Sequence, residues 1–362
     1  MSKLLKDLYS IEYINSLALN ISKFYPNFDI QSFINNIFNS SWNKLELKQR
    51  IDHISCAINI NLPFSYTKQL KILIQTYKEF SNKNHYLQNI IFANFVKLYG
   101  LDNFNISIKA LEIFTINSTA EFAIREFILK YEDKTLAQMR LWTQSNNEHL
   151  RRLASEGSRP RLPWAKSLTK YKKDPSKVIQ ILTLLQDDNC LYVKKSVANN
   201  LNDISKDHPQ IVIDIAKKWY GQNEHKNWII KHALRTLLKE ANQEVLNIFG
   251  YKIKKDIKIE NFTMNNSVKI GDYLNFSFDI KDINILKKLR IEYSIDFLRQ
   301  NNSSNNKVFF ITQKNINNKI YRVNKKHSFK ILTTRKYYTG IHRLNIIING
   351  IIVHKKEFNL IG

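Results

Sequence analysis

Cysteine and glycine are scarce in this chain of 362 residues. The two cysteines, Cys56 and Cys190, lie far apart, and neither belongs to a CxxC or a Cys/His cluster. This excludes a disulfide framework and argues against a structural zinc site, as expected of a protein in a reducing cytoplasm. The eight glycines form neither a GxxxxGK[ST] nor a GxGxxG motif, so both common nucleotide-phosphate loops are excluded.

Long uncharged hydrophobic runs are also missing. No run reaches the ~18 residues that a membrane-spanning helix requires. Residues 1–17 carry charges between their apolar positions, which predicts an amphipathic helix and not a signal peptide. The nine histidines show no HExxH or similar spacing, and no Ser–His–Asp arrangement is evident. We therefore expect no membrane partner, no metal and no cofactor.

Positive charge is abundant. The chain has 56 Lys and Arg against 31 Asp and Glu, a formal net charge of +25. Such a balance favours a polyanionic partner, either nucleic acid or an anionic membrane surface. The hydrophobic share of 43% and the aromatic share of 12% are typical of folded domains and argue against disorder.

Residues 1–248 show helical spacing of apolar positions, and from about residue 106 a rhythm of helix pairs appears. The first helices of the pairs are expected at 106–115, 134–144, 175–186 and 209–219, and the second at 119–131, 148–157, 190–204 and 225–240. Three second helices resemble one another: HLRRLASE (149–156), YVKKSVAN (192–199) and WIIKHALR (228–235). Pairs that recur at ~40 residues predict an α-solenoid of HEAT-like helical repeats, whose second helices line a concave face. An ordinary helical bundle with chance similarity is the alternative.

After residue 250 the pattern changes to alternation of apolar and polar residues, which is typical of strands. Strands are expected at 274–280, 289–297, 308–311, 320–323 and 329–332, with a hairpin turn at Asn349-Gly350. About seven strands in ~110 residues predict an immunoglobulin-like β-sandwich. The fold class is thus multidomain α and β, with a helical domain at 1–250 and a sandwich at 251–362.

The expected sandwich is the more densely basic domain. It holds 22 Lys and Arg against 8 Asp and Glu, a net charge of +14. This charge suits contact with a polyanionic partner, although it could also serve only solubility.

Residues 150–164, LRRLASEGSRPRLPW, combine an acid, four arginines and a tryptophan. Arg152 and Glu156 are four apart and share a helix face. The helices on either side repeat this: one offers Glu121 and Arg125, and the other offers Lys195, Asn199 and Asp203 at steps of four. A single such pair is usually a solvated salt bridge, but recurrence on one concave face favours a site.

The loop that follows Gly157 contributes further candidates. Trp164, after Pro163, either fills space in the core or presents an aromatic face to a ligand. Arg159 and Arg161 flank the turn and could grip a phosphate backbone. The tryptophans Trp142, Trp219 and Trp228 occupy apolar helical positions and are expected in the core.

Four blocks carry a family resemblance: STAEFAIREFI (118–128), TLAQMRLW (135–142), HLRRLASEGSRPRLPW (149–164) and YVKKSVANNLNDISKDHP (192–209). They resemble the AlkC-type alkylpurine DNA glycosylases of the HEAT-like-repeat superfamily, whose longer members carry a C-terminal immunoglobulin-like domain. The resemblance implies base excision repair. A monomeric, monofunctional enzyme of the bacterial nucleoid would hydrolyse the N-glycosidic bond of 3-methyladenine and 3-methylcytosine in double-stranded DNA, without full base flipping.

The resemblance also assigns residues. It places the active-site acids at Glu121, Glu156 and Asp203, with Trp164 as the aromatic wall. Phosphate contacts are expected from Arg152, Arg159, Arg161, Lys194 and Lys195. A non-catalytic nucleic-acid-binding scaffold is the alternative, and a protein-binding solenoid is a more distant one.

Overall fold

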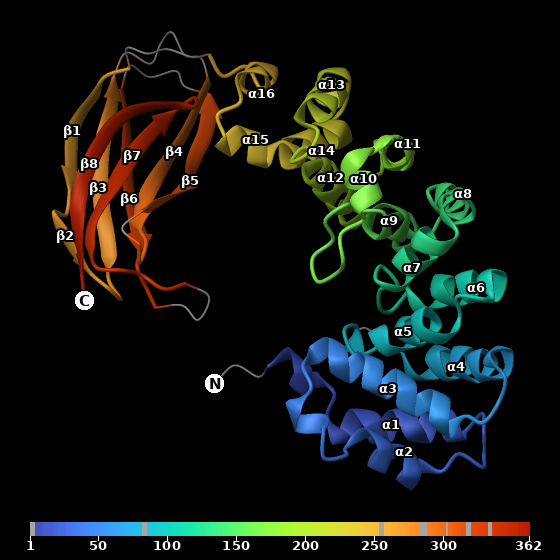
Figure 1. Cartoon of the computed structure of the whole chain (residues 1–362). Coiled ribbons are helices and arrows are strands. Elements are labelled where there is room, and N and C mark those ends of the chain that lie inside the picture. The colour runs from blue at the N-terminus through green and yellow to red at the C-terminus, as the bar shows by residue number, and fades with distance from the viewer. Residues whose placement is uncertain are drawn as a thin grey trace. The chain divides into compact units, whose positions relative to one another are not determined.

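The computed structural model describes residues 4–81, 85–252, 257–281, 288–301, 303–315, 320–331 and 335–362. Helices fill the chain up to Ile248, and strands follow from Ile259 (Figure 1). The expected order, a helical-repeat region followed by an immunoglobulin-like β domain, is confirmed. Among these residues, no helix is long and apolar enough to cross a membrane.

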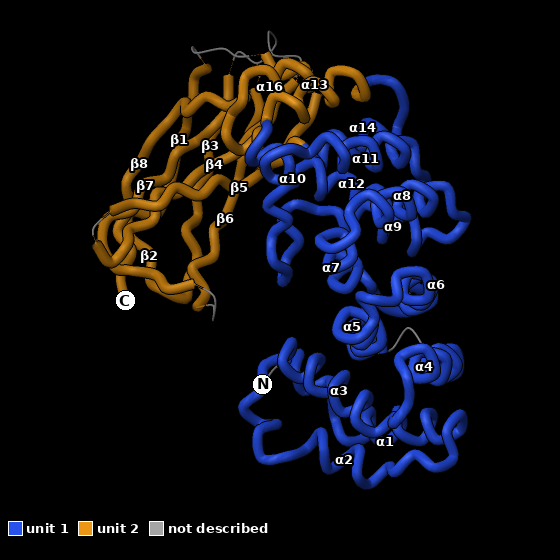
Figure 2. Tube along the Cα trace, turned by 45° about the vertical axis from the view of Figure 1, so that its right-hand side comes forward, with its two compact units in different colours: residues 1–208, 221–233 blue, residues 209–220, 234–362 orange. Residues whose placement is uncertain are grey.

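The chain forms two compact units (Figure 2). The first contains Met1–His208 and Gly221–Ala233, and the second contains Pro209–Tyr220 and Leu234–Gly362. The second unit thus includes three helices besides the sandwich. The domain boundary expected at residue 250 stays a prediction.

The N-terminal helices begin at polar caps. They are α1 (Ile11–Ser22), α2 (Ile30–Ile37), α3 (Leu47–Asn61), α4 (Tyr66–Phe80) and α5 (Ile90–Tyr99). The Ser10 side chain accepts a hydrogen bond from the Tyr13 amide at the start of α1, and Asp29 does the same for Ser32 at α2. Gly100 is the C-cap of α5, as expected, and a Cβ there would lie 2.2 Å from Tyr66 Oη.

The helix pairs follow as α6 (Phe104–Phe114), α7 (Ala123–Lys130), α8 (Glu132–Trp142), α9 (Glu148–Gly157), α10 (Thr169–Lys173), α11 (Ser176–Leu184), α12 (Leu191–Ile204), α13 (Pro209–Trp219), α14 (Glu224–Ala233), α15 (Arg235–Lys239) and α16 (Gln243–Ile248). The second helices α9, α12 and α14 pack side by side. Helix α12 buries Val193, Val197, Leu201 and Ile204, at helical steps of four, four and three.

Two expected helices differ in extent. The helix expected at 119–131 begins only at Ala123, so Glu121 lies in the turn before it. The helix expected at 225–240 is interrupted at Leu234 and forms α14 and α15. Neither break is marked by Gly or Pro in the sequence.

The β domain is a sandwich of two sheets, ordered β1-β3-β6 and β2-β8-β7-β4-β5. Its strands are β1 (Ile259–Met264), β2 (Ser267–Lys269), β3 (Tyr273–Lys281), β4 (Lys288–Leu298), β5 (Ser304–Asn315), β6 (Ile320–Ser328), β7 (Gly340–Ile348) and β8 (Ile351–Ile361). Inward residues such as Phe276, Phe278, Tyr293 and Phe297 form its core.

The sandwich confirms the expected hairpin and corrects one strand. Asn349 and Gly350 both have positive φ, 45° and 82°, as a tight turn between β7 and β8 requires. The separate strand expected at 329–332 is wrong: β6 runs to Ser328, and the backbone of 329–331 is irregular. Leu332 lies outside the described residues.

Candidate active site

The corner after α9 is shaped by a close approach of two helices. Helix α9 ends at Gly157, where a Cβ would lie 2.5 Å from Ile124 Cγ2 of α7. Glycine therefore lets the two helices approach closely. The Ser158 hydroxyl donates to the carbonyls of Ala154 and Ser155, at 3.0 and 2.9 Å, and satisfies the end of the helix.

Arg125 of α7 fixes the loop that follows this corner. Its Nη1 donates to the carbonyls of Gly157 and Arg159, at 3.1 and 2.7 Å, and its Nη2 donates to the Lys166 carbonyl at 2.6 Å. Burial and the positive charge of Arg159 lower the pKa of Arg125 to about 10. Sequence spacing paired Arg125 with Glu121, but its hydrogen bonds go to backbone carbonyls.

Five side chains form a continuous acid–arginine ladder in the order Glu121, Arg152, Glu156, Arg159, Asp203. Arg152 Nη2 lies 2.7 Å from Glu121 Oε2 and 3.8 Å from Glu156 Oε1. Arg159 continues the chain, with Nη1 2.6 Å from Glu156 Oε1 and Nε 2.8 Å from Asp203 Oδ2. The structure thus brings together all three acids that the sequence predicts.

The ladder is buried, and its three carboxylates face two guanidinium groups. A third cation, the exposed Lys206, pairs with Asp203, with Nζ 3.4 Å from Oδ1. The exposed fractions of Glu121, Glu156 and Asp203 are 9%, 6% and 4%. Burial opposes the charge on Arg152, but Glu121 and Glu156 outweigh it and raise the pKa of Arg152. Burial also disfavours the charge on Arg159, but the carboxylates of Glu156 and Asp203 outweigh burial and raise the pKa of Arg159.

Two hydroxyl groups that sequence reasoning missed complete the ladder. Thr119 Oγ1 donates to Glu121 Oε2 at 2.8 Å and lies 3.2 Å from Arg152 Nη1. Ser196 Oγ of α12 donates to Glu156 Oε2 at 2.5 Å. Ser196 precedes Asn200 and Asp203 by one and two turns, so helical spacing could have placed it on this face.

A tyrosine pair supports the Arg152 end. The Arg152 guanidinium lies 4.7 Å from the centre of the Tyr192 ring, a cation–π distance. The hydroxyl groups of Tyr192 and Tyr86 are 3.0 Å apart. Burial raises the pKa of Tyr192, so this phenol is neutral at physiological pH.

Trp164 is presented to solvent. Its side chain is 55% exposed, so it is not a core plug. Its backbone φ is 64°, in the left-handed region that a bulky residue rarely adopts. Strain of this kind clusters at functional sites. Two of the three tryptophans expected in the core are buried, Trp142 and Trp219, but Trp228 is half-buried, which corrects that expectation.

The residues expected to contact DNA differ in exposure. Arg159 is 7% exposed and Arg152 is also largely enclosed, which favours holding the carboxylates over gripping phosphate. Arg161 is more open and forms a bidentate pair with Asp207, at 2.7 and 3.1 Å.

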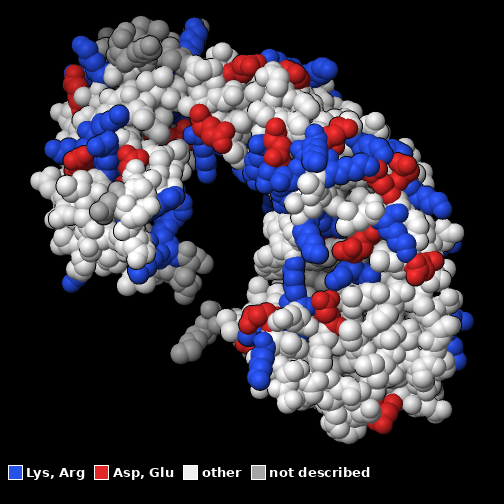
Figure 3. All heavy atoms as spheres, in the orientation of Figure 1, with Lys and Arg blue, Asp and Glu red and all other residues white. Residues whose placement is uncertain are grey.

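The two lysines lie on α12. Lys194 is half-buried, with Nζ 3.2 Å from His225 Nδ1, and Lys195 is exposed. Basic side chains gather around α9 to α12 in the view of Figure 3, whereas the surface of α1 to α4 shows few of them. A contact between any of these residues and DNA stays a prediction.

No metal centre is formed within the described part of the chain. No group of three or more His, Cys, Asp or Glu side chains there could hold an ion. The partners of the ladder acids are instead Arg152, Arg159, Lys206 and the hydroxyl groups of Thr119 and Ser196.

The chain matches known proteins over both of its parts. Residues 109–237 match the family described as "DNA alkylation repair enzyme", and residues 258–362 match the C-terminal Ig-like domain of "Uncharacterised protein YhaZ". Over 358 residues the sequence is 44% identical to the uncharacterized protein YhaZ of Bacillus subtilis (strain 168), covering 98% of this chain and 99% of the relative. The chain therefore belongs to the DNA alkylation repair enzyme family.

A solved structure shows which type of enzyme within this family the chain resembles. The fold superposes on the alkylpurine DNA glycosylase AlkC of Pseudomonas fluorescens, bound to DNA containing an abasic site analog, with a TM-score of 0.94. The two chains are 34% identical, and the match covers 99% of this chain and 100% of that one. Within the family, the protein is of the AlkC type, with the immunoglobulin-like domain that the sequence predicts.

Proposed function

We propose that this protein is a monofunctional DNA glycosylase that hydrolyses the N-glycosidic bond of cationic methylated bases, 3-methyladenine and 3-methylcytosine. The observation that carries the proposal is the acid–arginine ladder, in which three buried carboxylates adjoin the loop of an exposed indole. Kinship with an alkylpurine DNA glycosylase supports it.

The substrate's own charge simplifies the chemistry. A base methylated at N3 is already a cation, so it leaves as a neutral molecule and needs no general acid. As the bond stretches, positive charge moves to the deoxyribose, which becomes oxocarbenium-like. The enzyme's task is therefore to stabilise a cation on the sugar and to direct a water molecule to it.

The ladder suits that task because its three carboxylates are buried together, whereas one of their three cation partners, Lys206, is exposed. Glu156, at its centre, is held from both sides by Arg159 and Ser196, at 2.6 and 2.5 Å, so its carboxylate is fixed before substrate arrives. Such preorganised groups avoid reorganisation during the reaction. We assign Glu121, Glu156 and Asp203 to stabilising the sugar cation and orienting water.

Trp164 supplies an aromatic face. Its exposed indole lies outside the ladder, where the π-face can attract the sugar cation. We assign Arg152 and Arg159 first to holding the carboxylates.

Binding to double-stranded DNA involves both domains in this proposal. Arg161, Lys194 and Lys195, together with any outward surface of Arg152 and Arg159, would contact phosphates near the lesion. The basic sandwich would clamp the duplex, since its net charge of +14 suits a polyanion. We further propose that one monomer suffices and that the lesion base is not fully flipped out.

The test is base release. Duplexes that each contain one defined lesion, 3-methyladenine or 3-methylcytosine, are incubated with the protein at low salt, and free bases are measured by mass spectrometry. We expect release of both bases without strand cleavage, and no protein–DNA adduct after borohydride treatment. Duplex binding without release of either base would overturn the proposal and favour a non-catalytic scaffold.

A further inference from the structure

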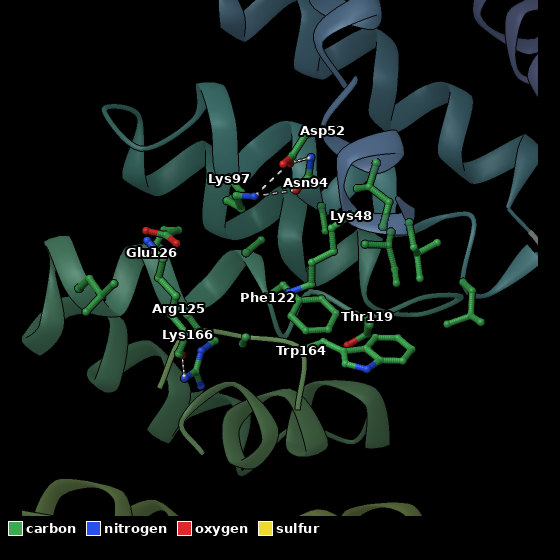
Figure 4. A pocket seen from close by; sticks show the side chains of 18 of the residues that line it. Lys48, Asp52, Asn94, Lys97, Thr119, Phe122, Arg125, Glu126, Trp164 and Lys166 are labelled. Carbon is green, nitrogen blue, oxygen red and sulfur yellow. Dashed lines mark hydrogen bonds and ion pairs between the residues drawn. The ribbon is translucent and has the colours of Figure 1, made fainter. Parts of the chain in front are cut away.

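A cavity of about 340 Å³ lies in the helical unit beside Trp164 (Figure 4). Its walls come from α3, α5, the start of α7 and the loop after α9, and they include Leu47, Ile51, Ile90, Phe122 and Trp164. The ladder residues Glu121, Arg152, Glu156, Arg159 and Asp203 do not line it. A largely apolar cavity of this size is typical of a small-ligand site. It adjoins the ladder at Thr119, which lines the cavity and donates to Glu121.

Two aromatic rings offer a stacking surface at one end of the cavity. Figure 4 shows Phe122 and Trp164 there, with Thr119 close to the indole, while Lys97, Asp52 and Asn94 gather at the other end. The indole is 55% exposed, so its face is open to a ligand. Flat aromatic groups such as nucleobases stack on such rings without requiring specific hydrogen bonds.

Lys48 of α3 extends into the same space. Its Nζ lies 5.4 Å from the centre of the Phe122 ring, and its amine has no hydrogen-bond or ion-pair partner among the described residues. Lys97, by contrast, is paired with Asp52 and Asn94 at 3.2 and 3.1 Å. Burial and the charge of Lys97 lower the pKa of Lys48. Lys48 is an exposed side chain, so an anion that enters from solvent can reach this amine and pair with it.

The lining as a whole carries more positive than negative charge. Its charged side chains are Lys48, Lys97, Arg125, Lys166, Asp52 and Glu126. Since Asp52 is already paired with Lys97, the balance at Lys48 favours a ligand with a negative group.

We propose that this cavity binds a nucleotide, with its base stacked on Phe122 and Trp164 and its phosphate held by the Lys48 amine. Two sources share this chemistry: a free nucleotide, and a nucleotide of the bound duplex other than the lesion. The proposal goes beyond base hydrolysis, which is assigned to the ladder and Trp164; the indole borders the cavity as well.

Calorimetric titration of the full chain with deoxyadenosine 5′-monophosphate tests the free source. We expect binding that weakens about tenfold in Lys48→Ala, because one charge-assisted hydrogen bond is lost. Lys48→Gln should behave alike. The control Lys44→Ala, an exposed lysine four residues earlier that does not line the cavity, should bind like the unchanged protein. Deoxyadenosine, without phosphate, should bind more weakly and be insensitive to Lys48→Ala.

A photochemical crosslink tests the duplex source. A duplex with an abasic site analogue and 5-iododeoxyuridine at a neighbouring position is irradiated on the protein, and the attachment site is mapped. A crosslink to Phe122 that is lost in Lys48→Ala supports a duplex nucleotide in the cavity. Duplex binding measured in the same samples separates failure of this inference from failure of DNA binding itself.

Three results would overturn the proposal. The first is absence of both nucleotide binding and the Phe122 crosslink while the duplex is bound. The second is nucleotide binding that is equal in the unchanged protein and Lys48→Ala. The third is binding of decanoate in place of the nucleotide, which would make the cavity a site for an alkyl chain.

Discussion

Two of the places where this chain buries charge differ in how that charge is balanced. In the helical unit, the ladder sets three carboxylates against two guanidinium groups. In the sandwich, Arg290 and Glu292 of β4 form a single pair at 2.5 Å, with side chains 7% and 2% exposed. In the first, the third positive charge comes from an exposed lysine, Lys206, which pairs with Asp203, whereas the second is a neutral pair that is buried on both sides.

The surroundings of the two places differ as well. The ladder adjoins the loop that presents Trp164 to solvent. The Arg290 amide donates to Asn349 Oδ1 at 2.8 Å, and the Asn349 amide donates to the Arg290 carbonyl at 2.9 Å. The sandwich pair therefore lies next to the hairpin between β7 and β8. Buried charge alone therefore does not identify a functional site; a cluster of buried carboxylates beside an open aromatic face does.

The largest effect is expected at the centre of the ladder. Glu156→Gln keeps the shape of the side chain but removes the charge that stabilises the sugar cation. We expect the single-turnover rate of 3-methyladenine release to fall by about 10²- to 10³-fold, with duplex binding nearly unchanged. Glu79→Gln, an exposed acid of α4, is the matched control and should retain full rate. An unchanged rate in Glu156→Gln would remove Glu156 from the mechanism.

The sandwich pair should show the opposite response. Glu292→Gln leaves the Arg290 guanidinium buried without its counter-charge, so the free energy of unfolding should fall by about 3 kcal/mol. Base release per folded molecule should stay the same. Denaturant unfolding and single-turnover kinetics on the same samples measure both. A loss of rate with unchanged stability would contradict the contrast between the two sites.

Acid should weaken the sandwich through His327. Burial and the charges of Arg335 and Lys325 lower the pKa of His327 to about 4. The folded state therefore binds fewer protons than the unfolded state, whose His pKa is about 6.5. The stability that the neutral His327 contributes is present above pH 6.5 and is lost as the pH falls toward 4. We expect the unfolding free energy to be about 2 kcal/mol lower at pH 5 than at pH 7.

A variant isolates that contribution. His327→Gln removes the titrating group, so the difference between pH 7 and pH 5 should shrink by most of that amount. The same pH dependence in both proteins would assign the acid sensitivity to other groups.

The smallest effect concerns the exposed lysine of α12. If Lys195 contacts one phosphate, Lys195→Ala should reduce the slope of log Kd against log salt by about one, without changing the rate at saturating enzyme. Lys71→Ala, on the N-terminal helix α4, should leave the slope unchanged. Equal slopes in all three proteins would exclude the predicted Lys195 contact.

Local periodicity made most of the fold predictable. The spacing of apolar residues predicted α6, α8, α9, α11, α12 and α13 within two residues at each end, but it did not predict α10. The Asn-Gly dipeptide predicted the turn at 349–350, where both residues have positive φ. The start of α7 was predicted too early, because nothing in residues 119–122 forbids a helix. Local sequence says least about where a helix begins.

The acids of the site were predictable from the sequence, but the ion-pair and hydrogen-bond partners of its arginines were not. Spacing placed Arg152 against Glu156, whereas the shorter contact of Arg152 is with Glu121 in a distant turn, 2.7 against 3.8 Å. The carbonyl partners of Arg125 belong to residues 32 to 41 positions away. Backbone acceptors carry no sequence signal, so tertiary packing alone selects them.

The most direct test asks whether the ladder favours a cation on the sugar. Two duplexes are compared, one with a protonated pyrrolidine in place of the lesion sugar and one with a neutral tetrahydrofuran of similar shape. We expect the protein to bind the cationic duplex at least about 10²-fold more tightly, as transition-state analogues bind, and Glu156→Gln to lose most of that preference. Equal affinity for both duplexes, or a preference that survives Glu156→Gln, would contradict the assignment of the ladder to the reaction.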